Sequence, residues 1–437
     1  MRELSRRTVL AAGVAVALAP HRLLAQERPR RGDFGTAELD SIRGAAREAV
    51  ASGDIPGAVS LVFRNGRIRH VQAEGLRDIE RQLPMERSAI FGIASMSKPV
   101  TVALALTLVD EGKMRLDDPI TRWAPEFANM RVLRRPDGPL DDTYAAPRAI
   151  TMEDLMTHQA GLGYGFLARG PLAGALFARF GLGIESELSP DAWMQALADL
   201  PLAYAPGERF FYGHSIDVLG FVVARALGST LGDAFRERLF EPLGMNDTDF
   251  WIPAAKRDRM AQGYSSPAPR EFNRATPPSF VGAGTPAYTS GGQGLVSTAD
   301  DYLAFARMLL QGGAVNGVRV LKRETVRWMT TNRLTEEQLK HPPSSAVALM
   351  PGQGFGLGMA LIDDPAAYRG YGGAGAFGWG GAFGGWWQAD PENDLVALWL
   401  QACLPAPPVP GQPLSPRIPG LRDTIEFQKR TYEALRG

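Results

Sequence analysis

The chain has 437 residues, 45% of them hydrophobic and 22% charged, and its 47 basic and 47 acidic side chains give a formal net charge of zero. This balance is ordinary for a globular protein, and it argues against nucleic acid or an acidic membrane surface as a partner. The single cysteine, Cys403, excludes an internal disulfide and a zinc site made of several cysteines. Its apolar surroundings indicate a buried core residue.

The first 25 residues have the pattern of an export signal. A charged start is followed by an apolar stretch of about a dozen residues and by Leu-Leu-Ala before Gln26. Arg6 and Arg7 resemble the pair of a twin-arginine signal, and the apolar stretch is too short for a spanning helix. We therefore expect cleavage after Ala25, a mature domain at residues 26–437, no membrane span in it, and a periplasmic or secreted location. The alternative is an uncleaved N-terminal anchor.

Strands are predicted near both ends of the mature chain. Residues 55–78 indicate two strands joined at Asn65-Gly66, the pair favoured in tight hairpin turns because both residues accept positive φ. Residues 384–404 indicate a second hairpin, with its turn at residues 390–394.

The middle of the chain is predicted to be mostly helical. Residues 97–113 have a helical pattern, with Pro99 tolerated in the first turn and Gly112 as the stop. Further helices are predicted at residues 152–158, 189–200, 215–228, 230–244, 297–313 and 420–437. Because strands come from both termini and helices fill the middle, we expect an α+β fold. It would have an antiparallel sheet from both chain ends, flanked by helices, with a mainly helical region inserted at roughly residues 115–290.

A candidate catalytic pair lies at the start of the helix predicted at residues 97–113. Ser95 and Lys98 stand three residues apart in IASMSKPVT, a spacing that places two side chains on one helical face. A serine hydroxyl needs a neighbouring base to act as a nucleophile. A lysine can be that base only where burial or another cation keeps part of it neutral. The apolar helix favours burial of Lys98, although serine at a helix start is usually only a cap.

Two further motifs accompany S-x-x-K: YGH at residues 212–214, and WGG at residues 379–381 just before the C-terminal hairpin. In this order the motifs resemble those of the serine β-lactamase-related proteins, which include class C β-lactamases, DD-peptidases and family VIII carboxylesterases. DLMTHQAGL, EPLGMNDT and TSGGQGLVSTADDYLAFARMLLQGG resemble the same family, from residue 55 to about residue 401. The resemblance implies a β-lactamase/transpeptidase-like fold with no metal and no organic cofactor, and W-x-G is most similar to the family VIII carboxylesterases.

The resemblance implies catalytic roles for Ser95, Lys98 and Tyr212. Ser95 would attack a carbonyl carbon and become acylated, while Lys98 and Tyr212 share the proton transfers. Which of the two is the base stays open. If Tyr212 is the base, its phenolate requires a nearby cation such as Lys98. The backbone N–H groups of Ser95 and Ala382 would hold the oxyanion.

The resemblance also implies substrate contacts. Gly380 and Gly381 would let the strand come close to the substrate, although a bulge is the structural alternative, as core packing is for Trp379. The third motif usually begins with Lys or His, which helps to hold a substrate carboxylate, whereas Trp379 offers only an indole N–H. His214 replaces the usual Asn, whose amide contacts a β-lactam or peptide. Both changes favour an ester with a neutral, fairly apolar acyl group.

GHSID at residues 213–217 offers a competing nucleophile, because it is one residue short of the G-x-S-x-G elbow of lipases. The final glycine of that elbow is replaced by Asp217, and only His341 follows Ser215 as a candidate triad histidine. We therefore interpret Ser215 as the start of a helix. The apolar, Gly-rich residues 165–184 are compatible with a lid over an acyl pocket and equally with a buried helix.

The sequence thus predicts an exported serine hydrolase that forms an acyl-enzyme, most favoured as a carboxylesterase on small-molecule esters with short to medium acyl groups. A β-lactamase, DD-peptidase or transacylase of the same fold is the nearest alternative, with a β-lactam as a further substrate. A non-catalytic protein that binds peptidoglycan fragments or a partner is the alternative of another class. The sequence does not specify the oligomeric state.

Overall fold

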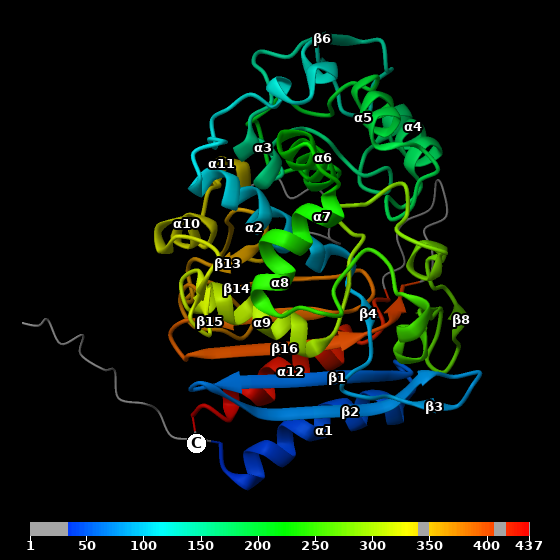
Figure 1. Cartoon of the computed structure of the whole chain (residues 1–437), viewed down its shortest axis with the longest axis vertical. Helices are drawn as coiled ribbons and strands as arrows, with labels where there is room; N and C mark the ends of the chain where they lie inside the picture. The colour runs from blue at the N-terminus through cyan, green and yellow to red at the C-terminus, as the bar shows by residue number, and fades with distance from the viewer. Residues whose placement is uncertain (1–33, 340–348, 406–416, 437) are drawn as a thin grey trace, which may run out of the picture. The chain divides into compact units, whose positions relative to one another are not determined.

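An eight-stranded antiparallel sheet organises the protein in the computed structural model, which describes residues 34–339, 349–405 and 417–436 (Figure 1). Its strands in spatial order are β12 (Gln353–Phe355), β13 (Ala360–Ile362), β14 (Phe377–Gly380), β15 (Trp386–Asp390), β16 (Leu395–Gln401), β1 (Gly57–Arg64), β2 (Arg67–Asp78) and β3 (Leu83–Pro84). β1 pairs with β16, so strands from the two chain ends lie side by side. The predicted α+β fold with a sheet built from both ends is confirmed.

The two predicted hairpins are present. Asn65 and Gly66 have φ angles of 50° and 79°, which match the right-handed twist of the flanking strands β1 and β2. The turn between β15 and β16 contains Asp394, also with positive φ (46°).

Smaller strand pairs and ladders are β4 (Phe91–Gly92) with β9 (Val296–Ser297), β5 (Arg131–Leu133) with β6 (Thr143–Ala145), β10 (Ala314–Val315) with β11 (Val318–Arg319), and β17 (Cys403–Leu404) with β7 (Tyr264–Ser265) and β8 (Asn273–Arg274).

The helices cover both faces of the sheet. They are α1 (Thr36–Ser52), α2 (Ser97–Asp110), α3 (Met152–Met156), α4 (Gly170–Phe180), α5 (Pro190–Ala198), α6 (Ser215–Leu227), α7 (Leu231–Phe235), α8 (Glu241–Leu243), α9 (Ala299–Leu310), α10 (Arg323–Met329), α11 (Glu336–Leu339) and α12 (Leu421–Glu433). α1 and α12 pack together on one face, and α9 lies on the other (Figure 1). β1 and β16 are therefore buried on both sides, which explains why most of their residues are apolar.

Several sequence predictions differ in their outcome. α1 and the two strands at one side of the sheet, β12 at its edge and β13 next to it, were not predicted. Cys403 is buried as expected, and burial raises the pKa of its thiol to about 12. Residues 165–184 contain the helix α4, whose apolar side is buried, while their role as a lid stays a prediction. The predicted export signal and His341 lie outside the described residues. Within the described residues, no single helix is long and apolar enough to cross a membrane.

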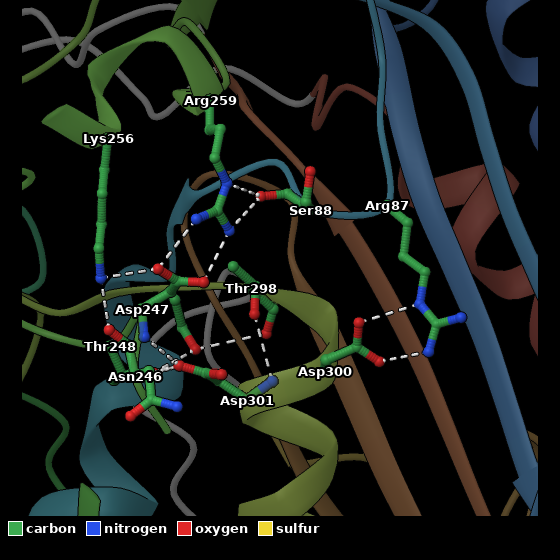
Figure 2. Close-up of polar contacts among 11 residues, drawn as sticks. Arg87, Ser88, Asn246, Asp247, Thr248, Lys256, Arg259, Thr298, Asp300 and Asp301 are labelled. Atoms are coloured by element: carbon green, nitrogen blue, oxygen red, sulfur yellow. Dashed lines mark hydrogen bonds and ion pairs between the residues drawn. The ribbon is translucent and has the colours of Figure 1, made fainter. Parts of the chain in front are cut away.

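A polar network fixes the segment that leads into the predicted active site (Figure 2). Asp301, in the first turn of α9, accepts hydrogen bonds from the Thr248 hydroxyl (2.9 Å) and from the Asp247 N–H (2.7 Å). The Asp247 carboxylate pairs with the Arg259 guanidinium at 2.6 Å. Arg259 also donates to the Ser88 carbonyl oxygen at 2.8 Å. The network thereby joins α9 and the loop after α8 to the chain just before β4.

The chain between Ser88 and the candidate nucleophile is held from two sides. β4 pairs with β9, and the Ile93 N–H donates to the Leu295 carbonyl oxygen at 3.0 Å. On the other side, the Ile90 N–H donates to the Arg259 carbonyl oxygen at 2.9 Å. The backbone that precedes Ser95 therefore has little freedom to move.

Asp423, buried in the first turn of α12, should make stability depend on pH. Burial and the charge of Asp54 raise the pKa of Asp423 from its ordinary 3.8 to about 6. Between pH 3.8 and about pH 6, the native state therefore binds more protons than the unfolded state. The free energy of unfolding falls as the pH rises through this range. Asp423→Asn should remove that fall and stabilise the protein by ~1 kcal/mol at pH 7, after allowance for partial solvent screening.

Urea unfolding of both proteins at pH 4 and pH 7 measures this effect. The variant and the parent should differ more at pH 7 than at pH 4. The same pH dependence in both proteins would contradict a raised pKa for Asp423.

Candidate active site

Ser95 and Lys98 are brought together as their spacing predicts. Ser95 lies in the short 3-10 helix η1 (Ala94–Met96), directly before α2, and the Lys98 Nζ atom is 3.2 Å from its Oγ atom. Lys98 has no exposed surface, and 9% of Ser95 is exposed. Ala94 has a φ of 43°, a backbone conformation that costs a non-glycine residue roughly 1–2 kcal/mol. The fixed segment before Ser95 maintains this conformation.

Two further groups contact the Lys98 amine. It donates to the Gly292 carbonyl oxygen at 2.9 Å and lies 3.2 Å from the Tyr164 hydroxyl. Sequence reasoning missed both: Tyr164 was not singled out at all, and Gly292 was noted only within a flanking stretch. Burial, and next the charge of Asp217, raise the pKa of Tyr164 well above its ordinary value, so Tyr164 stays a neutral phenol.

Tyr212 lies beside the same amine but presents the face of its ring. The Lys98 Nζ atom is 4.6 Å from the Tyr212 ring centroid, a cation–π geometry. The Tyr212 hydroxyl accepts a hydrogen bond from the Trp379 indole N–H at 3.3 Å. His158, buried and also missed, packs on the Tyr212 ring with centroids 4.5 Å apart. Burial and the nearby charge of Lys98 lower the pKa of His158 well below its ordinary value, so it is neutral at pH 7.

The third motif meets the segment that carries Ser95. Trp379 and Gly380 end β14, and Gly381 follows, with its N–H donating to the Gly385 carbonyl oxygen at 2.7 Å. A Cβ atom on Gly381 would lie 2.3 Å from the Ile93 carbonyl oxygen. This glycine therefore permits a close approach between two backbones, where the sequence predicted an approach to substrate. Ala382, the next residue, stays the predicted oxyanion donor together with Ser95.

His214 and Ser215 lie inside the protein. Only 1% of His214 is exposed, and its ring is enclosed by Tyr164, Phe180 and Trp193. Its role in substrate binding stays a prediction. Ser215 has no exposed surface, and within the described residues its Oγ atom has no hydrogen-bond partner. Ser215 begins α6 as expected and lacks the base and access that a nucleophile elbow requires.

Asp217 contacts Gly292 and Tyr164, two residues that also contact the Lys98 amine. Its carboxylate has no exposed surface and accepts hydrogen bonds from the Gly292 N–H (3.0 Å) and the Ser290 hydroxyl. Burial acts to raise the pKa of Asp217, but the hydrogen bond and charge of His214 and the charge of Lys98 outweigh it, so the pKa lies below its ordinary value. Asp217 is therefore ionised. The sequence analysis used this residue only as evidence against the elbow.

Comparison with known proteins places the chain among enzymes. The family model described as Beta-lactamase matches residues 42–410. Protein Rv1367c of Mycobacterium tuberculosis is 45% identical over 413 residues, covering 91% of this chain and 99% of that protein. Esterase EstB of Burkholderia gladioli is 33% identical, covering 83% and 91%. The solved structure of EstCE1, a hydrolase with promiscuous acyltransferase activity, is 28% identical with a TM-score of 0.74, covering 91% and 98%.

The chain belongs to the Beta-lactamase family, as the motifs predicted. With an esterase and an acyltransferring hydrolase among its relatives, it is a serine hydrolase or acyltransferase of the β-lactamase fold. Within the described residues, no group of three His, Cys, Asp or Glu side chains lies together as a metal site requires.

Gly381→Ala should separate β14 from the backbone before Ser95, because the neighbouring Ile93 carbonyl oxygen cannot turn away as a side chain would. We expect a loss of about 1–3 kcal/mol in the free energy of unfolding and a lower rate of ester turnover. Gly380→Ala is the matched control, since its nearest neighbour would be the Gly385 carbonyl oxygen at an ordinary 3.5 Å. Urea unfolding compares the two variants, and equal stability would argue against the close approach.

Proposed function

We propose that the protein is a carboxylesterase that forms an acyl-enzyme on Ser95. The observation that carries this proposal is the fully buried Lys98 amine, 3.2 Å from the Ser95 Oγ atom. This amine lies within hydrogen-bond reach of the proton that must leave the serine.

The reaction has two halves. Ser95 attacks the ester carbonyl carbon while its proton passes to the group formed by Lys98 and Tyr212, and the N–H groups of Ser95 and Ala382 hold the oxyanion. The same proton then passes to the oxygen of the leaving alcohol as the C–O bond breaks. In the second half, water loses a proton to this group and attacks the acyl carbon, and Ser95 recovers its proton as the acid leaves.

The surroundings favour a neutral, fairly apolar acyl group of short to medium length. The Trp379 indole N–H is bonded to the Tyr212 hydroxyl, so the third motif offers no charge to a substrate carboxylate. Apolar and aromatic side chains cluster around Trp379 and Tyr212, namely Tyr164, Phe166, Leu167, Phe210, Leu334, Leu349, Phe355 and Ala360. Burial of an acyl chain against such surfaces is favourable by about 25 cal/mol per Å² of apolar area.

Acyl transfer to an alcohol is the second candidate, supported by the likeness to EstCE1. An acyl-enzyme accepts any nucleophile that reaches its carbonyl carbon, so hydrolysis and transfer use the same first half. The signal-like residues 1–25 support the further proposal that the enzyme acts in the periplasm or outside the cell.

Replacement of the two candidate serines tests the proposal. Ser95→Ala should lower kcat/KM for p-nitrophenyl butyrate by roughly 10³-fold or more, as for other catalytic nucleophiles. Ser215→Ala is the matched control and should retain activity within about twofold, because its hydroxyl has no partner in the described residues. A reactive phosphonate should label Ser95, as peptide mass spectrometry can show. Label on Ser215, or activity in Ser95→Ala, would refute the acyl-enzyme on Ser95.

The substrate class is tested by comparing p-nitrophenyl acetate, butyrate and octanoate with a chromogenic cephalosporin. We expect the butyrate to have at least roughly tenfold higher kcat/KM than the cephalosporin, because the third motif offers the neutral Trp379 to the β-lactam carboxylate. Faster cephalosporin turnover would favour the β-lactamase alternative. A rise in ester product with added alcohol, at constant release of nitrophenol, would favour acyl transfer. Folded protein that turns over none of these and takes no label would favour a binding protein.

A further inference from the structure

Asp217 is a buried charge that the two-step reaction above does not use. It lies in the first turn of α6 with no exposed surface. Its Oδ1 atom accepts from the Gly292 N–H at 3.0 Å and from the Ser290 hydroxyl. Its Oδ2 atom lies 3.5 Å from the Tyr164 hydroxyl and 3.4 Å from the His214 Nδ1 atom. A buried carboxylate with four partners is costly to assemble, and its surroundings indicate its purpose.

The Asp217 carboxylate holds two of the three groups that share hydrogen bonds with the Lys98 amine. The amine contacts the Gly292 carbonyl oxygen (2.9 Å), the Tyr164 hydroxyl (3.2 Å) and the Ser95 Oγ atom (3.2 Å). Asp217 binds the N–H of the same Gly292 and faces the hydroxyl of the same Tyr164. The carboxylate therefore acts on Lys98 through both neighbours and not by direct contact.

The direction of each hydrogen bond follows from which atoms carry protons. An ionised carboxylate only accepts, so the Tyr164 O–H points to Asp217 and its oxygen lone pairs face Lys98. The Gly292 carbonyl oxygen also only accepts. Lys98 must be in its neutral form to accept a proton, and in that form the amine has two N–H bonds and one lone pair. When Tyr164 and Gly292 take the two N–H bonds, the lone pair is left for the Ser95 hydroxyl proton.

We propose that Asp217 is a positioning residue that orients Tyr164 and Gly292 as acceptors, so that the Lys98 lone pair is directed at Ser95. This inference rests on the proposed function and deepens it. Lys98 accepts the Ser95 proton as the Oγ–carbon bond forms. In this arrangement His214 donates from Nδ1 to Asp217, which gives a reason for its burial beneath Tyr164.

Asp217→Asn tests the proposal, because it keeps the size of the side chain and removes the charge. An amide can donate to the Tyr164 oxygen, and the phenol proton would then turn toward Lys98 and compete for its lone pair. We expect kcat for p-nitrophenyl butyrate to fall roughly 10²-fold, the range of a misdirected general base, with KM unchanged within about twofold. A role in stability alone would lower the melting temperature and leave kcat of the folded fraction intact.

Asp390→Asn is the matched control. Asp390 is equally buried and accepts from the Gly373 N–H (2.8 Å) and the Tyr432 hydroxyl (2.9 Å), but it ends β15 and contacts α12 on the other face of the sheet. We expect this variant to lose stability and to retain kcat within about threefold. A similar fall in kcat for both variants would reduce Asp217 to a structural residue.

A double-mutant cycle with Tyr164→Phe tests whether Asp217 acts through Tyr164. If it does, the kcat loss of the double variant should be clearly smaller than the product of the two single losses. Losses that multiply would overturn the proposed route.

Should Asp217→Asn fail to fold, Ser290→Ala takes its place, since it removes one hydrogen bond to Asp217 and does not touch Lys98. It should lower kcat about three- to tenfold with KM unchanged, and parental kcat would count against the proposal.

The rate of Ser95 labelling by a phosphonate separates this inference from the proposed function. If the parent is labelled but hydrolyses no ester, the carboxylesterase proposal fails. A roughly 10²-fold slower labelling of Asp217→Asn would still support the positioning role. Equal labelling rates in the parent and in Asp217→Asn would overturn it. If the parent is not labelled at all, both proposals fail together.

Discussion

The site depends on keeping one buried lysine amine fully hydrogen-bonded. Lys98 has no exposed surface, and its partners are Ser95, Tyr164 and the Gly292 carbonyl oxygen. An amine that leaves water without such partners loses several kcal/mol, of order 2–7 for a polar group in an apolar setting. The partners come from separate parts of the chain, so the amine can be satisfied only when η1, α2 and the loops carrying Tyr164 and Gly292 are packed together. The same requirement that stabilises the fold brings Ser95 and Tyr164 to the amine.

The position of Ser95, the candidate nucleophile, depends on backbone contacts from three directions. β9 pairs with the strand before Ser95, the chain at Arg259 bonds Ile90 on the other side, and Gly381 at the end of β14 approaches the Ile93 carbonyl oxygen. The polar network around Asp301 secures the first two of these neighbours (Figure 2). Groups that must hold a reacting atom within a few tenths of an ångström need rigid supports of this kind. The eight-stranded sheet contributes one of these supports through the end of β14.

A neutral residue at the head of the third motif changes what the site can recognise. The Trp379 indole N–H is committed to the Tyr212 hydroxyl, and the ring of Tyr212 in turn covers the Lys98 amine. A penicillin-like substrate carries a carboxylate that would meet no fixed cation from this motif. A cluster of buried apolar side chains packs against Trp379, in keeping with the neutral acyl group proposed above. The likeness to esterase EstB and to EstCE1 agrees with this direction.

The sequence by itself determined the local features: the hairpin at Asn65-Gly66, the helix α2, and the pairing of Ser95 with Lys98, because each depends on residues a few positions apart. Motif order also predicted the family, and the strands expected near both termini predicted the sheet built from both chain ends. Only the tertiary structure placed Tyr164 and Gly292 on the Lys98 amine, across 66 and 194 residues of chain. It also buried His214, which its motif had assigned to substrate. Such contacts have no periodicity or spacing in the sequence, since long-range packing alone decides which buried polar groups meet.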